Sequence, residues 1–341
     1  MPSNAIEALK AILGDRLVLN EPLARHTTFG IGGPADGFVV AHTLPELCEL
    51  VRLAWEKGVP YFILGGGANL LVSDRGIRGL VIQNRCAAVE IVKADEAALR
   101  DGRYGELGEA SESAWLLKAE SGAALRSVAR QAVAHGLAGL EWAVDVPGTV
   151  GGAVVGNAGA FGGYVSDSLY GVYVFSPEGG QRWWPSRELK LTYRSSIFKS
   201  PQRITRPDAE RREGQGKKSA DFSAVILSAT FALHPEDSAV LQAKVAAYSK
   251  RRAESQPPGL SAGSVFKRTE QYPAGFLIEN AGLKGARVGG AVVSTMHANF
   301  IINQGMATAS DVQQLIELIR TTVYARFRIM LELEIELVGE W

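Results

Sequence analysis

A block of small residues at positions 146–163 constrains this chain more than any other feature. The chain holds 38 glycines among its 341 residues, which exceeds the usual share of about 7%, and this block is one of the richest stretches. Glycine loses more conformational freedom on folding than other residues, so a long run of it needs a reason. We therefore expect a ligand to lie against this backbone. A glycine-rich connection packed under a sheet remains the alternative.

A second glycine cluster directly follows a predicted strand at 61–64. It consists of Gly65, Gly66, Gly67, Ala68, Asn69 and Leu70. Because glycine has no Cβ, consecutive N–H groups of such a loop can approach an anion, although a tight turn is the alternative. Leu70 stands where a G-x-G-x-x-G motif needs its last glycine, and no Walker-type loop is present. The sequence therefore disfavours both a standard Rossmann site and a P-loop.

Hydrophobic periodicity predicts a chain of mixed helices and strands. Strands are expected at 38–41, 61–64, 80–82, 171–176 and 224–233, and helices at 6–13, 45–57, 123–135 and 239–254. The strand–helix–strand order in the first part is typical of a βαβ unit.

The C-terminal part combines a long helix with an alternating strand. A capping box at 310–313 predicts the start of the helix. Its buried stripe comprises Val312, Leu315, Ile316, Ile319 and Val323. Strict alternation over 329–337 predicts a last strand that presents Glu332, Glu334 and Glu336 on the face opposite its apolar residues.

Composition narrows the functional class. The chain has 36 basic and 36 acidic residues and a formal net charge of zero, which disfavours a general nucleic-acid binder. Cys48 and Cys86 are its two cysteines, and its histidines are scattered, so neither a disulfide framework nor a metal site is expected. Without a leader-like start or a long apolar run, we expect a cytoplasmic protein with no membrane partner. The polar stretch 199–221 is expected to be a mobile surface insertion.

Three single residues are candidates for catalysis. Arg194 could clamp a carboxylate, Ser264 could donate a proton, and Glu334 could act from the last strand. Taken one at a time, each has a plainer interpretation: a surface arginine, an ordinary loop serine and the solvated face of a strand.

Read together and in order, the motifs resemble those of the UDP-N-acetylenolpyruvoylglucosamine reductase family. They are the segments 26–33, 65–71, 147–152, 157–162, 193–199, 262–267 and 331–334. The resemblance implies an α+β chain with an FAD-binding fold of the vanillyl-alcohol-oxidase type. It implies FAD-binding subdomains at 1–90 and 91–234 and a substrate-binding domain at 235–341. No counterpart of the extra tyrosine-bearing loop is evident, so the chain resembles the family's shorter type.

The resemblance also implies roles for particular residues. It places Arg194, Ser264 and Glu334 in catalysis and Tyr193, Lys267, Arg268 and His297 at the substrate. It places Gly65, Gly66, Gly67, Ala68, Asn69, Leu70, Pro147, Gly148, Thr149, Gly151, Gly152, Asn157, Gly159 and Ala160 at FAD. Arg268 stands where many relatives carry asparagine, and we expect it to meet the pyrophosphate of a UDP-sugar substrate.

The reaction that the resemblance implies has two halves. NADPH reduces FAD, and the hydride then passes to C3 of the enolpyruvyl group, after which Ser264 protonates C2. Arg194 and Glu334 would stabilise the charge that develops. The expected protein is a monomer in peptidoglycan synthesis. The alternatives are another FAD-dependent oxidase or dehydrogenase of the same fold and a non-catalytic nucleotide-sugar binding protein.

Overall fold

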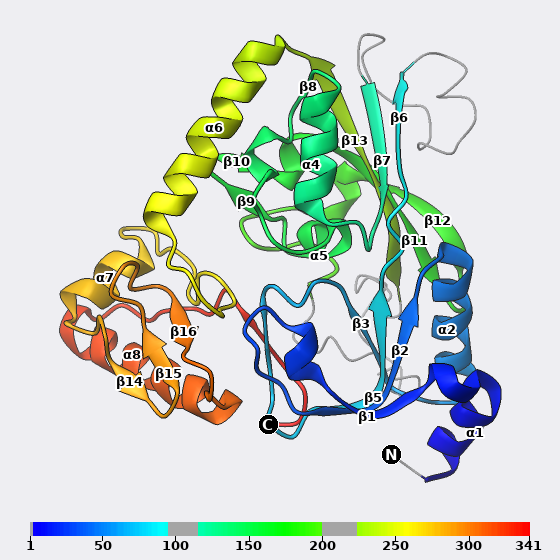
Figure 1. The fold of residues 1–341 in the computed structure, drawn as a ribbon, viewed down its shortest axis with the longest axis horizontal. Helices are drawn as coiled ribbons and strands as arrows, with labels where there is room; N and C mark the ends of the chain where they lie inside the picture. Colours follow the sequence, from blue (N-terminus) through cyan, green and yellow to red (C-terminus); the bar gives the residue numbers. More distant parts are fainter. Residues whose placement is uncertain (1–2, 95–114, 200–223) are drawn as a thin grey trace, which may run out of the picture. The chain divides into compact units, whose positions relative to one another are not determined.

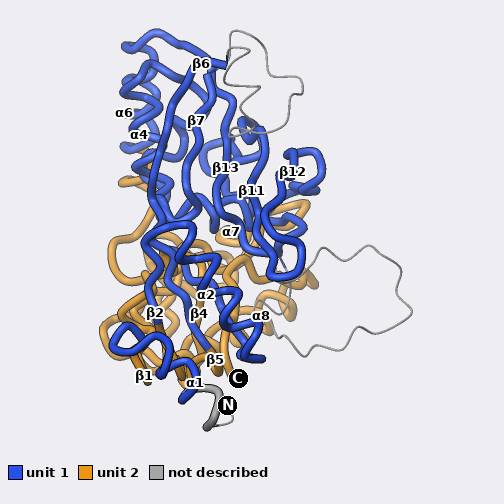
Figure 2. Tube along the Cα trace, turned by 90° about the vertical axis from the view of Figure 1, so that its right-hand side faces the viewer, with its two compact units in different colours: residues 1–17, 39–65, 80–250 blue, residues 18–38, 66–79, 251–341 orange. Residues whose placement is uncertain are grey.

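The computed structural model describes residues 3–94, 115–199 and 224–341. Residues 95–114 and most of the polar stretch 199–221 lie outside the described residues. The chain forms two compact units, each assembled from three segments (Figure 2). Unit 1 comprises residues 1–17, 39–65 and 80–250, and unit 2 comprises residues 18–38, 66–79 and 251–341. The division into three domains at residues 90 and 234 stays a prediction.

Unit 1 contains a six-stranded sheet whose main path runs β12-β11-β13-β7-β6 (Figure 1). The strands are β6 (Val89–Lys93), β7 (Trp115–Glu120), β11 (Leu169–Ser176), β12 (Gly180–Pro185) and β13 (Val225–Pro235). Neighbouring strands pair antiparallel, and short β8 (Leu137–Ala138) pairs with the end of β13. The strands predicted at 171–176 and 224–233 are confirmed as β11 and β13.

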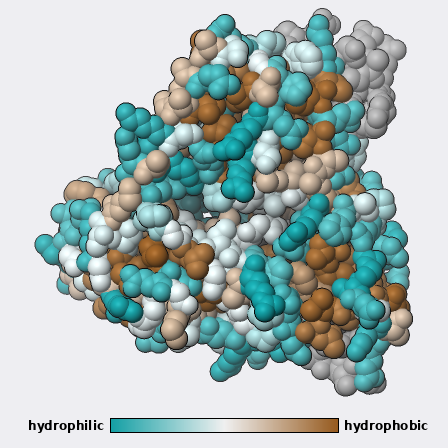
Figure 3. All heavy atoms as spheres, viewed as in Figure 1, coloured by the Kyte–Doolittle hydropathy of each residue, from teal (hydrophilic) through white to brown (hydrophobic). Residues whose placement is uncertain are grey.

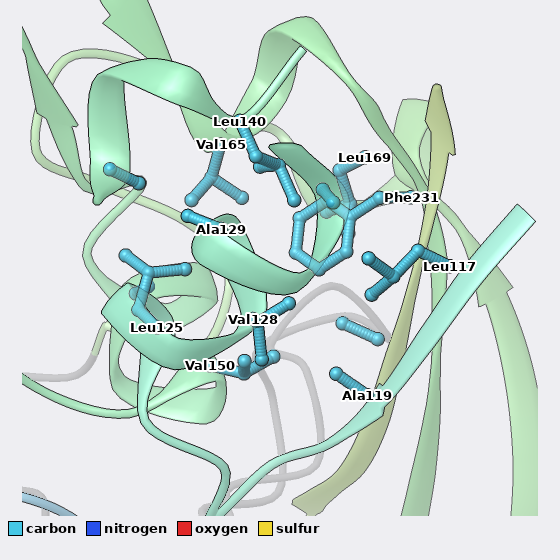
Figure 4. Packing of buried hydrophobic residues seen from close by; sticks show 14 of the residues in the cluster. Leu117, Ala119, Leu125, Val128, Ala129, Leu140, Val150, Val165, Leu169 and Phe231 are labelled. Atoms are coloured by element: carbon cyan, nitrogen blue, oxygen red, sulfur yellow. The ribbon is translucent and has the colours of Figure 1, made fainter. Parts of the chain in front are cut away.

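Helices α4 (Leu125–Ala134) and α5 (Val150–Val155) pack against this sheet. Their apolar side chains meet those of β7, β11 and β13 around Phe231, which is fully buried (Figure 4). Helix α6 (Ser238–Ser255) joins the same core through buried Leu241. The predicted helices at 123–135 and 239–254 are therefore confirmed.

A second core of unit 1 surrounds α1 (Ser3–Leu13) and α2 (Leu44–Glu56). Strand β3 (Tyr61–Leu64) pairs in parallel with β5 (Ile77–Asn84), with Tyr61 opposite Leu80. Helix α2 links β2 (Pro34–Ala41) to β3, so the predicted order of strand, helix and strand is confirmed. Cys48 and Cys86 are free and buried in this core, and burial raises the pKa of Cys86 to about 12.

Unit 2 packs two helices and several short strands around its own core. The helices are α7 (Ala274–Asn280) and α8 (Ala309–Phe327), and β14 (Arg287–Val288), β15 (Ala291–Val293) and β16 (Ile301–Asn303) form a three-stranded sheet. Strand β1 (Val18–Pro22) pairs with β2, while β4 (Leu70–Val72) pairs in parallel with β17 (Glu336–Val338). The short helix η2 (Leu23–His26) also lies in unit 2. The remaining short elements belong to unit 1 and are β9 (Gly159–Ala160), β10 (Gly163–Tyr164), η1 (Gly14–Arg16), η3 (Glu141–Ala143), η4 (Val165–Asp167) and η5 (Ser186–Leu189).

The structure corrects two predictions about the C-terminal part. The capping box of α8 is formed by Thr308 and Asp311, not by the residues at 310–313. The predicted strand at 329–337 is reduced to β17, because Glu334 and Ile335 both donate their N–H groups to Val265 O and break the alternation. The buried stripe of α8 is as predicted.

The described surface is mixed in character. On the face drawn in Figure 3, apolar residues form separate patches among polar ones. None of the described helices combines the length and the hydropathy that crossing a bilayer needs. Among the described residues, no three His, Cys, Asp or Glu side chains are grouped as metal ligands would be.

Truncation of Phe231 tests the core of unit 1. Phe231 is fully buried between α4 and the sheet, and such truncations leave a cavity. We expect Phe231→Ala to lower the free energy of unfolding by roughly 3–5 kcal/mol. Denaturant unfolding followed by circular dichroism measures the change, with the exposed Val240→Ala as the matched control. A loss no larger than that of the control would contradict this packing.

Candidate active site

The glycine-rich block begins with a capped helix that lies against Gly65. Thr149 is the N-cap of α5, and its Oγ1 accepts a hydrogen bond from Gly152 N at 3.4 Å. A Cβ added at Gly65 would lie only 2.4 Å from that Oγ1 atom. Gly65 is therefore glycine because the backbone here passes directly beside the helix cap.

The other side of the block is held by the turn that follows β7. Gly151 N donates to Ser121 O at 2.8 Å, and Val150 N donates to Ala123 O at 2.9 Å. Gly148 O accepts from Leu125 N at 3.1 Å. The start of the block is thus held by main-chain bonds to residues 121–125 and lies against Gly65 on its other side.

Asn157 joins this block to the segment that carries Arg194. Asn157 is 3% exposed and has a positive φ of 39°. Its Nδ2 donates to Thr192 O at 3.0 Å, and its Oδ1 accepts from Ser166 N at 3.0 Å. Ser196 adds a bond from its Oγ to Val155 O at 2.7 Å. These side chains anchor the segment, and the FAD contact of Asn157 stays a prediction.

Arg194 lies at the tip of a tight turn in that segment. Thr192 and Ser195 exchange main-chain hydrogen bonds of 3.0 and 3.1 Å, and Arg194 between them has a φ of 56°. Lys199 Nζ donates to Arg194 O at 2.9 Å. The guanidinium carbon of Arg194 lies 5.7 Å from the centre of the Tyr193 ring. Unit 1 therefore carries Arg194 on a braced turn beside the glycine-rich block.

In unit 2, the loop after Gly66 presses against the segment 26–28. Gly67 has a φ of 61°, and a Cβ there would lie 2.2 Å from His26 O. Thr28 N donates to Gly67 O at 3.2 Å, and Thr28 Oγ1 donates to Ser261 O at 2.8 Å. Only glycine fits this close approach with a left-handed backbone.

The segments of Ser264 and Glu334 lie side by side in unit 2. Glu334 N donates to Val265 O at 2.8 Å, and Ser264 forms a bridge with Phe300. On the far side of Glu334, Asn69 Nδ2 donates to Glu334 O at 3.1 Å. Ser264, Glu334 and the glycine loop are thus brought into one cluster, whereas Arg194 belongs to unit 1.

Asn299 is a residue of this cluster that the sequence reasoning missed. It is 7% exposed. Its Oδ1 accepts from Phe266 N at 3.0 Å, and its Nδ2 donates to Phe266 O at 2.8 Å. Its own carbonyl accepts from Val265 N at 2.8 Å. A polar residue inside the apolar run 298–302 is the signal that could have revealed it, since buried amides need partners.

The predicted substrate residues differ in their surroundings. Lys267 Nζ lies 3.1 Å from Glu332 Oε2, and Arg268 is exposed. The Nδ1 atom of His297 accepts from Asn299 N at 3.2 Å, and its ring meets Phe300 edge-on at 4.9 Å. Burial lowers the pKa of His297, with a further lowering by Lys284. Tyr193, at 38% exposed, is open to solvent in unit 1.

The residues around both glycine loops fit a flavin nucleotide. Gly65 and Gly67 make approaches that a Cβ would block, and Gly66 between them is exposed, so the main chain there is open to pyrophosphate oxygens that need N–H donors. Gly152 and Gly162 are exposed within the second block, which leaves its backbone open to a flat ring.

Comparison with known proteins decides the family. A model of the UDP-N-acetylenolpyruvoylglucosamine reductase C-terminal domain matches residues 255–338, and an FAD binding domain matches residues 35–183. The reductase of Alkaliphilus oremlandii is 38% identical over 97% of this chain and 96% of its own. The chain belongs to the UDP-N-acetylenolpyruvoylglucosamine reductase family. It is therefore an FAD-dependent oxidoreductase of peptidoglycan synthesis that uses NADPH.

Two further relatives agree with this assignment. The reductase of Chloroflexus aggregans is 39% identical over 94% of this chain and 96% of its own. The crystal structure of the Thermus caldophilus reductase has a TM-score of 0.70 and 29% identity, and it covers 94% of this chain and 98% of its own. The expected α+β fold with an FAD-binding domain of the vanillyl-alcohol-oxidase type is confirmed.

A rescue experiment tests the approach of Gly65 to Thr149. In Gly65→Ala the new Cβ collides with Thr149 Oγ1, so the loop must shift. We expect FAD affinity to fall by about tenfold or more, which corresponds to roughly 1.4 kcal/mol of binding free energy. Thr149→Ala removes the colliding atoms, so the double variant should recover affinity despite losing the helix cap. Fluorescence titration of the apoprotein with FAD measures this. A double variant no better than Gly65→Ala would contradict the geometry.

The lowered pKa of His297 predicts a pH dependence of stability. The unfolded chain, with a histidine pKa of about 6.5, binds a proton that the folded protein resists. The contribution of neutral His297 is therefore fully present above about pH 6.5 and is lost as the pH falls toward the lowered folded value. We expect His297→Gln to flatten the decline of the melting temperature between about pH 7 and 5. Equal slopes in both proteins would contradict the prediction.

Proposed function

We propose that this chain reduces the enolpyruvyl group of UDP-N-acetylglucosamine-enolpyruvate with Arg194, Ser264 and Glu334 as its catalytic residues. The observation that supports it is the cluster in unit 2, where Glu334 N bonds to Val265 O beside Ser264 and Glu334 O bonds to Asn69. The segments that carry the proposed proton donor and carboxyl group therefore lie beside Asn69 of the loop that we assign to the cofactor.

When bound, FAD supplies the hydride that adds to C3 of the vinyl group. Negative charge then develops on the side of C2 and the carboxylate. The Ser264 hydroxyl donates its proton to C2, a task for which a serine needs electrostatic help. The positive charge of Arg194 and a protonated Glu334 stabilise the enolate-like state, and preorganised donors of this kind contribute roughly 3–4 kcal/mol each.

The remaining assignments belong to the same proposal. The loop from Gly65 to Leu70 holds the FAD pyrophosphate, and the backbone from Pro147 to Ala160 lies along the flavin. Tyr193, Lys267, Arg268 and His297 contact the UDP-sugar. The protein is of the family's shorter type, with three domains divided at residues 90 and 234, and it acts as a cytoplasmic monomer.

Removing the Ser264 hydroxyl separates the two half-reactions. In Ser264→Ala we expect NADPH to bleach the flavin absorbance at the normal rate, because no proton donor to carbon is needed. Return of the flavin bands on adding the enolpyruvyl sugar nucleotide should slow by roughly 100-fold or more. Stopped-flow absorbance under anaerobic conditions measures both rates.

Ser255→Ala is the matched control, since its hydroxyl only bonds to Arg251 O at the end of α6. It should behave as the unaltered protein in both halves. Equal slowing of both half-reactions in Ser264→Ala would refute the assignment of the proton donor.

A further inference from the structure

Asn69 contacts the main chain that directly follows the Glu334 side chain. Its Nδ2 donates to Glu334 O at 3.1 Å, and its own carbonyl oxygen accepts from Glu336 N at 2.9 Å. The two residues are 265 positions apart in the sequence. The bond to Glu334 O sets the orientation of the Asn69 side-chain amide, because only the NH₂ group of an amide can donate to a carbonyl oxygen.

Asn69 is itself held firmly on both sides. The carbonyl of Gly67 accepts from Thr28 N at 3.2 Å, and the next residue, Leu70, is buried and pairs with Glu336 in the β4–β17 ladder. The amide therefore works from a rigid support, which is what positioning a catalytic group requires.

Glu334 has main-chain partners at both of its ends. Its N–H donates to Val265 O at 2.8 Å, next to Ser264, and its C=O accepts from Asn69. Without the Asn69 amide, the peptide after Glu334 loses its side-chain tether, and the carboxyl group can drift relative to Ser264. Displacements near 1 Å at a reacting centre cost up to about 100-fold in rate.

We infer that Asn69 is a positioning residue that orients Glu334 for the reduction of the enolpyruvyl group. The inference rests on the proposed role of Glu334. It gives the Asn69 side chain a task in addition to the cofactor contact predicted from its loop: the loop that faces the cofactor also sets the place of the glutamate.

Two variants remove the tether in different ways. Asn69→Ser shortens the side chain and loses the donor, while Asn69→Asp keeps the size and turns an acceptor toward Glu334 O. FAD content and the rate of reduction by NADPH are measured for both variants, and reoxidation is compared per bound FAD. Reoxidation by the sugar nucleotide should slow by about 10- to 100-fold. Asn280→Ser is the matched control, because its amide makes a similar bond, to Phe276 O at 2.8 Å, away from Glu334.

A double variant distinguishes positioning from general damage. If Asn69 acts through Glu334, adding Asn69→Ser to Glu334→Gln should slow reoxidation no further than Glu334→Gln alone. Hydrogen exchange of the apoprotein gives a second readout, in which the amides at 334–336 should exchange faster in Asn69→Ser and unchanged in Asn280→Ser.

These measurements distinguish failure of the proposed role of Glu334 from failure of the positioning role of Asn69. If Glu334→Gln reoxidises normally, the proposed function of Glu334 fails. If Glu334→Gln is slow but Asn69→Ser is normal, or if the two effects multiply, the positioning role is overturned. Loss of FAD from both Asn69 variants, with unchanged exchange at 334–336, would also overturn it and assign the amide to the cofactor.

Discussion

The organisation of unit 2 depends on the parallel pairing of β4 with β17. Three residues of each strand pair in register, from Leu70 opposite Glu336 to Val72 opposite Val338. Ser73 extends the contact, since its N–H donates to Val338 O and its hydroxyl bonds to Glu340 O. Through this ladder the C-terminal segment meets the glycine loop, and Glu334 takes its place between that loop and Val265. Backbone pairing thus links two segments that are distant in the sequence, as a disulfide or a metal ion does in other proteins.

In unit 1 the glycine-rich block depends on a different constraint, which is that glycine has no side chain to keep neighbouring backbone segments apart. The contact between Gly65 and the Thr149 cap leaves no room for a Cβ. Main-chain bonds to Ser121 and Ala123 then fix the start of the block. Glycine loses more conformational entropy on folding than other residues do, but its lack of a Cβ permits the close approach of the backbone here. The hydrogen bonds around these residues, including those of the buried Asn157 amide, hold them in place.

The elements with clear periodicity could be predicted from the sequence. Helix α2, strand β3 and the buried stripe of α8 follow from spacing that tertiary packing reinforces. Helix α5 could not, because glycine is a poor helix former, and its burial against the sheet overrides that propensity. The alternation before β17 was misleading, since two successive N–H groups share Val265 O.

The candidate site was predictable in part for similar reasons. Clusters of glycine indicate that backbone segments approach closely, so both glycine-rich loops could be predicted from the local sequence. Arg194, Ser264 and Glu334 stood out only by their resemblance to a family, because nothing local distinguishes a loop serine from a proton donor. The bonds of Asn69 and Asn299 join positions far apart in the sequence, and a single sequence does not encode such pairs in any visible pattern.

The way unit 2 is assembled has a consequence for biosynthesis. Its first segment begins at residue 18, yet the strand that completes the β4 ladder lies at 336–338. Pairing of such distant segments is intrinsically slow, because a long loop of chain must close before the contacts form. On the ribosome, β4 is synthesised long before its partner strand. The pairing of β4, and with it the tether of Asn69 to Glu334, must therefore wait until β17 has been synthesised.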